Sequence, residues 1–99
     1  MSNGADLIKK ERNRQITEEG WTTAHDLEHE SNELEFAAIS YALPVNSPER
    51  QGLVFWPWPW KTWKPIKSSR IKELVKSGAL IAAAIDLELA KKPRSDRNV

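Results

Sequence analysis

Proline and tryptophan alternate in the segment FWPWPWKTWKP at residues 55–65, and this run constrains the fold more than any other feature. It holds four of the five tryptophans and three of the six prolines in the chain. Pro57 and Pro59 lack the backbone N–H that a strand ladder needs, which excludes a central β-strand. We therefore expect an extended, polyproline-like or turn-rich loop. Because disordered segments are depleted in large aromatic rings, most of these rings should pack between helices.

The length, net charge and cysteine content of the chain limit the number of domains, the partners and the kinds of metal site that it can have. Its 99 residues suit one domain spanning 1–99, which buries only roughly two-thirds of its unfolded surface. Fifteen Lys and Arg residues against fourteen Asp and Glu residues give a net charge of +1, which argues against a partner such as long nucleic acid. No cysteine is present, so disulfides and thiolate metal sites are excluded.

The hydropathy pattern indicates a protein without a membrane segment. The first residues lack the apolar run of a leader, and GALIAAAI at 78–85 is too short to span a bilayer. We expect a cytoplasmic protein with no membrane partner.

Two stretches before the Trp/Pro run are typical of helices. Residues 5–19 are rich in helix formers and stop at Gly20, which suits a left-handed C-terminal cap. Residues 23–43 should be helical with room for a break near 31, because Thr23 with Asp26 and Asn32 with Glu35 have the spacing of two N-terminal caps. The second part is apolar on two faces, which predicts a central helix wrapped by others.

The last helix is predicted over 69–91 and follows a long loop at 44–67. Ser68 or Ser69 can cap it, and its apolar residues recur at helical spacing. Gly78 and the neighbouring alanines predict the close approach of another helix or of a second subunit, so we expect a homo-oligomer. Residues 92–99 form a basic tail. The fold class is therefore mainly α: a small bundle of three to four helices with a long irregular Trp/Pro-rich loop.

The segment HDLEHESNE has three possible interpretations. His25 and His29 share a helix face, and Asp26, Glu30 or Glu33 could join them around a divalent metal. The weak metal candidates are His25, His29 and Glu33. The plainer interpretation is a polar turn whose side chains cap backbone groups. Glu30 and Glu33 also have the spacing of one half of a magnesium cluster in helical nucleotide pyrophosphatases, but no second pair follows.

Catalytic motifs are otherwise missing from the sequence. It contains no glycine-rich phosphate loop and no serine or cysteine nucleophile with a nearby base. We expect no enzyme and no cofactor, with a metal-dependent nucleotide hydrolase as an open alternative.

Lysines next to the Trp/Pro run suggest a binding surface. One or two rings beside Lys61 and Lys64 could stack on a base while the cations hold phosphate, and the same residues would suit a protein interface. We expect Trp60 or Trp63 to face the partner. The candidate ligand-binding residues are Trp21, His25, Asp26, His29, Trp56, Trp58, Trp60, Lys61, Trp63, Lys64 and Arg70.

The chain resembles a family of small phage and prophage proteins over residues 11–85. The shared pattern is E-R-x-R-Q, E-G-W-T, H-D-x-x-H, E-L-x-x-A-A-x-x-Y-A, W-P-W, W-K-P and R-x-x-L-V-x-x-G-A-L-I. The resemblance implies an accessory protein that acts in the cytoplasm of the host cell.

A second resemblance is to the ryanodine-receptor repeat domain, through Gly20-Trp21-Thr22 and the later W-P-W run. The helix at 33–43 has no counterpart in that domain, and the spacing from Arg70 to Gly78 is shorter. This likeness implies a module that senses nucleotide-like ligands.

Together these features favour a phage accessory protein that sequesters a small nucleotide-derived ligand, such as a host immune signal. One alternative is a protein inhibitor of a host defence complex, similar to an anti-CRISPR protein, that acts through its Trp patch. The other is a metal-dependent nucleotide pyrophosphatase.

Overall fold

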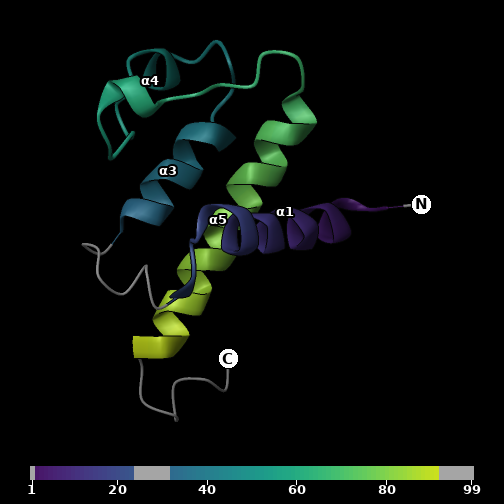
Figure 1. The fold of residues 1–99 in the computed structure, drawn as a ribbon. Helices are drawn as coiled ribbons and strands as arrows, with labels where there is room; N and C mark the ends of the chain where they lie inside the picture. Colours follow the sequence, from purple (N-terminus) through teal and green to yellow (C-terminus); the bar gives the residue numbers. More distant parts are fainter. Residues whose placement is uncertain (1, 24–31, 92–99) are drawn as a thin grey trace.

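The computed structural model describes residues 2–23 and 32–91 (Figure 1). Its elements are α1 (Gly4–Glu19), α3 (Glu33–Ala42), α4 (Pro48–Gln51), the 3₁₀ turn η1 (Trp60–Thr62) and α5 (Arg70–Lys91). Within these ranges the chain is mainly helical and has no strand, which confirms the predicted fold class. None of the helices in the described ranges is long and apolar enough to cross a bilayer.

Local signals explain where the helices begin and end. Asn3 and Asp6 form a reciprocal capping box at the start of α1, and Gly20 ends the helix in the left-handed conformation with φ 71°. The hydroxyl of Ser69 accepts the amide hydrogen of Lys72 at 3.1 Å, as expected for a cap of α5.

The predicted cap at Asn32 is wrong. Asn32 does precede α3, but its backbone is left-handed with φ 77° and its side chain makes no capping hydrogen bond. Residues that cap a helix with their side chain usually have an extended backbone, and the left-handed backbone of Asn32 departs from that geometry. The other predicted cap depends on Asp26, which lies outside the described residues.

Helix α5 is the central element, with α1 and α3 packed on different sides of it (Figure 1). Helix α3 runs antiparallel to α5, since Arg70 at the start of α5 bonds the carbonyl of Ala42 at the end of α3. Helix α1 crosses α5, and an ion pair of 3.4 Å between Arg12 and Asp86 joins the two helices.

Gly78 explains how closely α1 approaches. A Cβ atom at this position would lie 2.5 Å from Cδ1 of Ile8, which is inside contact distance. The close approach predicted at Gly78 is therefore made by α1 of the same chain. Ala79, Ala83 and Ala84 are also buried inside the chain. The Gly/Ala face is thus not free for the subunit contact that we expected from it.

The core lies between α3, α5 and the Trp/Pro loop. Its buried centre consists of Ala37, Ala38, Tyr41 and Leu80. Trp21, Leu34, Trp56, Trp58 and Trp63 are half-buried and pack against this centre. Small residues on α3 leave the space that the large indole rings fill, so the loop acts as a lid on α3.

The prediction that α3 is wrapped on both apolar faces is wrong. Phe36 and Ile39 remain exposed, and Phe36 only stacks on Phe55 at a centroid distance of 6.3 Å. The Trp/Pro loop covers one side of α3 and α5 covers the next. No described element is left to cover the third side.

The loop at 44–67 is more regular than predicted. Ser47 caps the single turn of α4, and Pro48 occupies the first helical position, where its missing N–H costs nothing. The ring of Trp63 packs 4.7 Å from Tyr41 and 4.9 Å from Trp56, measured between centroids, and the guanidinium of Arg50 lies over it. Trp60 starts η1, and 72% of its surface is exposed.

A buried carboxylate of α5 joins the loop to α3 and α5. Glu73, which is 1% exposed, accepts hydrogen bonds from Arg50, from Arg70 at 3.1 Å and from the backbone amide of Ile66 at 3.0 Å. The two arginines also donate to the carbonyl of Tyr41, at 3.3 Å from Arg50 and 2.8 Å from Arg70. We call Glu73, Arg50, Arg70 and the Ile66 amide the Glu73 clamp. It satisfies carbonyls at the end of α3 that would otherwise lack donors.

The two indole rings at the end of the loop should differ sharply in their contribution to stability. Replacing Trp63 by Ala should lower the free energy of unfolding by about 3 kcal/mol, because a packed ring and its cation–π contact are lost. Replacing the exposed Trp60 by Ala should change it by less than about 0.5 kcal/mol. Urea unfolding followed by circular dichroism measures both; equal losses would contradict this packing.

Replacing Glu73 by Gln should destabilise the protein strongly. The substitution leaves the buried Arg50 guanidinium without a counter-ion, which typically costs about 3–5 kcal/mol. Replacing the exposed Glu49 of α4 by Gln is the matched control and should have little effect. Chemical unfolding of the three proteins at neutral pH tests this expectation, and it fails if both variants behave like the parent.

The clamp should also make stability depend on pH. Burial alone would raise the pKa of Glu73, but the hydrogen bonds from Arg50, Ile66 and Arg70 outweigh it and hold that pKa below its ordinary value of 4.5. The clamp contribution is therefore complete above pH 4.5 and is lost as the pH falls through the lowered pKa. The stability difference between the parent and the Glu73→Gln variant should shrink on acidification. A difference that stays constant would show that Glu73 does not titrate as described.

Candidate anion-binding groove

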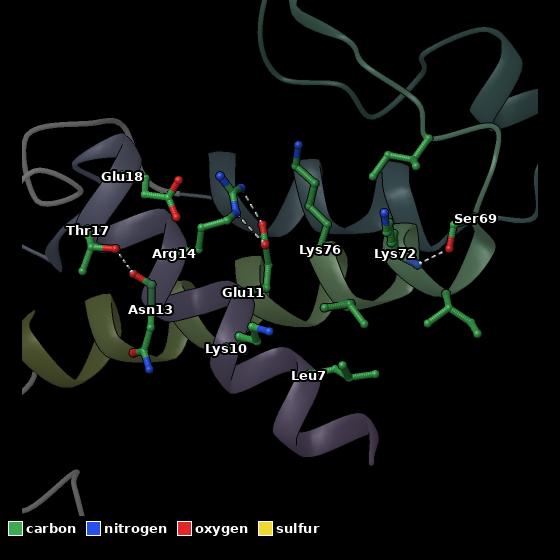
Figure 2. Close-up of a pocket in the computed structure, with 13 residues that line it drawn as sticks. Leu7, Lys10, Glu11, Asn13, Arg14, Thr17, Glu18, Ser69, Lys72 and Lys76 are labelled. Carbon is green, nitrogen blue, oxygen red and sulfur yellow. Dashed lines mark hydrogen bonds and ion pairs between the residues drawn. The ribbon is translucent and has the colours of Figure 1, made fainter. Parts of the chain in front are cut away.

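A groove of about 790 Å³ lies between α1 and the first half of α5 (Figure 2). The segment that leads into α5 closes one end of it through Ile66 and Ser69. Its apolar lining comes from Leu7, Ile66, Ile71 and Val75. Its charged lining comes from Lys10, Glu11, Arg14, Glu18, Lys72 and Lys76. We call this site the cationic groove.

Helical periodicity explains why the groove cations lie on common helix faces. Lys10 and Arg14 are four residues apart on α1, and Lys72 and Lys76 are four apart on α5, so each pair shares one helix face. The crossing of α1 over α5 turns the two faces toward the same groove. Glu11 and Glu18 supply two carboxylates, which leaves an excess of positive charge in the lining.

Arg14 is held in a fixed position by Glu11. Its Nε and Nη2 atoms each donate to one carboxylate oxygen of Glu11 at 2.8 Å (Figure 2). A carboxylate oxygen of Glu19 lies 3.6 Å from Nη1 of Arg14. The hydrogen bond from Arg14 lowers the pKa of Glu11, although burial opposes the shift. The same pairing raises the pKa of Arg14, so the guanidinium is always charged. This pair forms a rigid polar wall of the groove.

Lys76 is the groove lysine that is partly shielded from water and yet has no carboxylate partner in the described ranges. Its side chain is half-buried, and its ammonium lies 5.0 Å from the centroid of the Tyr41 ring. Burial lowers the pKa of Lys76; Glu19 and Glu11 oppose this shift, while Arg14 and Lys64 add to it. Within the described ranges, no carboxylate lies within ion-pair distance of this ammonium. An anionic ligand would supply the missing counter-charge.

The sequence-based candidates do not converge on one site. Trp21, Trp56, Trp58 and Trp63 pack on the core, and the indole nitrogen of Trp56 donates to the Thr62 hydroxyl at 3.1 Å. Trp60 and Lys61 are exposed together on η1, as one part of the prediction expected. In Figure 1 this turn lies beside α4 on the left, whereas the N-terminal part of α1 lies on the right.

The remaining candidates have different surroundings. Lys64 is exposed near the end of the loop and repels Lys76 through space. Arg70 is engaged in the Glu73 clamp, so its guanidinium holds backbone carbonyls and is not free for a phosphate. His25, Asp26 and His29 lie outside the described residues. Glu33 accepts a hydrogen bond from the indole of Trp58, and no trio of His, Cys, Asp or Glu within 2–23 and 32–91 could hold a metal ion.

Sequence reasoning missed the groove residues Lys10, Arg14, Lys72 and Lys76. The signal was available in part, because each pair has i, i+4 spacing on its own helix. What the pattern does not contain is the crossing of α1 over α5, which depends on the contact between Ile8 and Gly78.

No protein-family model, curated protein or solved structure matches this chain. The resemblances to phage proteins and to the ryanodine-receptor repeat therefore stay predictions, and the functional argument depends on the geometry of the groove.

Proposed function

We propose that the protein is a binding module that takes a small phosphate-bearing ligand of nucleotide size into the cationic groove. The observation that carries this proposal is the half-buried Lys76, which has no carboxylate partner in the described ranges and faces a groove lined by three further cations. A volume of about 790 Å³ falls within the usual range of small-molecule sites.

The groove offers different chemistry to the two ends of such a ligand. The ammonium groups of Lys10, Lys72 and Lys76 can donate hydrogen bonds to phosphate oxygens. These bonds are strong because the donor and the acceptor are both charged. The apolar lining suits the flat face of a base or the carbons of a sugar. The Glu11 and Glu18 carboxylates accept hydrogen bonds, which favours ligands that also carry amino or hydroxyl donors.

In this proposal the ligand lies in the cationic groove and not on the tryptophans. The sequence predicted stacking on Trp60 or Trp63, but Trp63 supports the core and η1 lies away from the groove. A protein that binds such a ligand without converting it lowers the free ligand concentration. That action fits the expected role of a phage accessory protein that removes a host immune signal.

A second candidate function is supported by the exposed η1 turn. Trp60 is 72% exposed beside Lys61, and a solvated indole next to a cation is typical of protein interfaces. This surface would suit an inhibitor that docks on a protein of a host defence complex.

Calorimetric titration distinguishes the two candidates. With a panel of cyclic and linear nucleotides and with inorganic pyrophosphate, we expect heat of binding that weakens as salt rises. Replacing Lys76 by Met should weaken binding at least about tenfold, which corresponds to about 1.4 kcal/mol. Lys72→Met should weaken it as well.

Two matched controls complete the experiment. Replacing Lys9 by Met removes an exposed cation from α1 that does not line the groove, and it should leave binding unchanged. Trp60→Ala should also bind like the parent. Loss of binding in the Trp60 variant together with normal binding in the Lys76 variant would place the site at η1. If no compound of the panel gives heat of binding, the ligand proposal is wrong.

A further inference from the structure

Among the cations that line the cationic groove, Lys76 has the half-buried amine (Figure 2). Its nitrogen lies 5.0 Å from the centroid of the Tyr41 ring, which shields one side of the amine from water. Lys10 and Lys72 are exposed, so water solvates their ammonium groups. The Arg14 guanidinium is held by a carboxylate of its own helix and stays charged. Lys76 therefore combines partial burial with a primary amine, which is a nucleophile once it loses its proton.

The surroundings of Lys76 make the unprotonated amine easier to reach. In the described part of the chain, no carboxylate lies within ion-pair distance of its nitrogen. Burial lowers the pKa of Lys76, and the nearby charges of Arg14 and Lys64 add to this shift. The carboxylates of Glu19 and Glu11 oppose the shift without cancelling it. A lowered pKa increases the neutral fraction at neutral pH, and desolvation beside other cations is how proteins activate a lysine nucleophile.

The groove supplies both parts of a site for an anionic carbonyl compound. A neutral lysine amine attacks the carbonyl carbon of an aldehyde or ketone, and the ammonium groups of Lys10 and Lys72 can hold a phosphate of the same molecule. We propose that Lys76 forms a reversible imine with an aldehyde or ketone that also carries a phosphate. This inference rests on the proposed function, because the phosphate has to bind in the cationic groove.

The imine forms without an oxidant or a reductant. The lone pair of the Lys76 nitrogen forms the C–N bond while the carbonyl π pair moves to the oxygen, and a proton passes from the nitrogen to that oxygen. The hydroxyl group then takes up one proton and leaves as water, while the nitrogen lone pair completes the C=N bond. The product is a protonated imine, so Lys76 still offers a positive charge to the phosphate.

Reductive trapping with two matched aldehydes tests the proposal. Pyridoxal phosphate carries a phosphate, and deoxypyridoxal has a methyl group in place of the phosphorylated hydroxymethyl group; both serve only as probes. Each is incubated with the parent protein and cyanoborohydride, and peptide mapping by mass spectrometry locates the reduced adduct. We expect Lys76 to carry most of the adduct from pyridoxal phosphate. Trapping of deoxypyridoxal at Lys76 should be at least about tenfold slower, because the charged hydrogen bonds to the phosphate are lost.

Two variants separate the phosphate contacts from the amine. Lys72→Met should slow the trapping of pyridoxal phosphate at Lys76 more than the trapping of deoxypyridoxal, because only the first probe has a phosphate to lose contact with. Lys9→Met removes an exposed lysine of α1 that does not line the groove, and it should leave the trapping of both probes at Lys76 unchanged. In the parent protein, the adduct at Lys9 measures the background labelling of an exposed amine. Circular dichroism confirms that the variants stay helical.

Two results would overturn the imine proposal, and they differ in what they mean for the proposed function. If nucleotides or pyrophosphate give heat of binding but the adduct is spread equally over Lys76 and Lys9, the imine is wrong and the anion site stands. If both aldehydes label Lys76 at equal rates and the titration gives no heat, the phosphate contacts are wrong and the proposed function fails with them.

Discussion

The carboxylate of Glu73 is the interaction on which most of this structure depends. It is buried in α5, and two of its partners come from other segments: Arg50 from the short α4 and the Ile66 amide from the loop. The third partner is Arg70 at the start of α5 itself. A buried carboxylate without partners would be costly, so these partners must arrive together. Because Arg50 and Arg70 also bond the last carbonyls of α3, one group joins α3, α5 and the loop.

The clamp explains why a long, proline-rich loop has a defined conformation. Prolines remove backbone donors, so the loop cannot secure itself by strand pairing. It is secured instead by Arg50 and Ile66 near its two ends and by indole rings that fill the space over Ala37 and Tyr41. The Ile66 contact also bears on the proposed function, since Ile66 lines the end of the cationic groove. Glu73 thus contacts both the lid and one residue of the groove lining.

The surface of α5 divides into regions with different chemistry. One side faces α3 and the clamp, and a second faces α1, where the ends of Lys72 and Lys76 reach the groove. Leu74, Ile81 and Ile85 remain exposed beside the contact between Gly78 and Ile8. A small chain has too few elements to cover every side of a 22-residue helix, so some apolar residues of α5 stay exposed. The half-buried Lys76 has no carboxylate partner in the described ranges, which favours an anion.

The sequence by itself determined the helical class, because the caps at Gly20 and Ser69 and the period of the apolar residues are local properties. It also indicated that most tryptophans would pack on the core and that Gly78 would meet another helix. Both predictions depend on properties of single residues: proline has no backbone N–H for strand pairing, and glycine has no side chain to keep a neighbouring helix away. The sequence did not determine which helix fills Gly78, which arginines neutralise Glu73, or which lysines share a groove. Those outcomes depend on α1 crossing α5 and on the loop folding back. Contacts between distant residues follow from the packing of whole elements, and only the tertiary structure decided that packing.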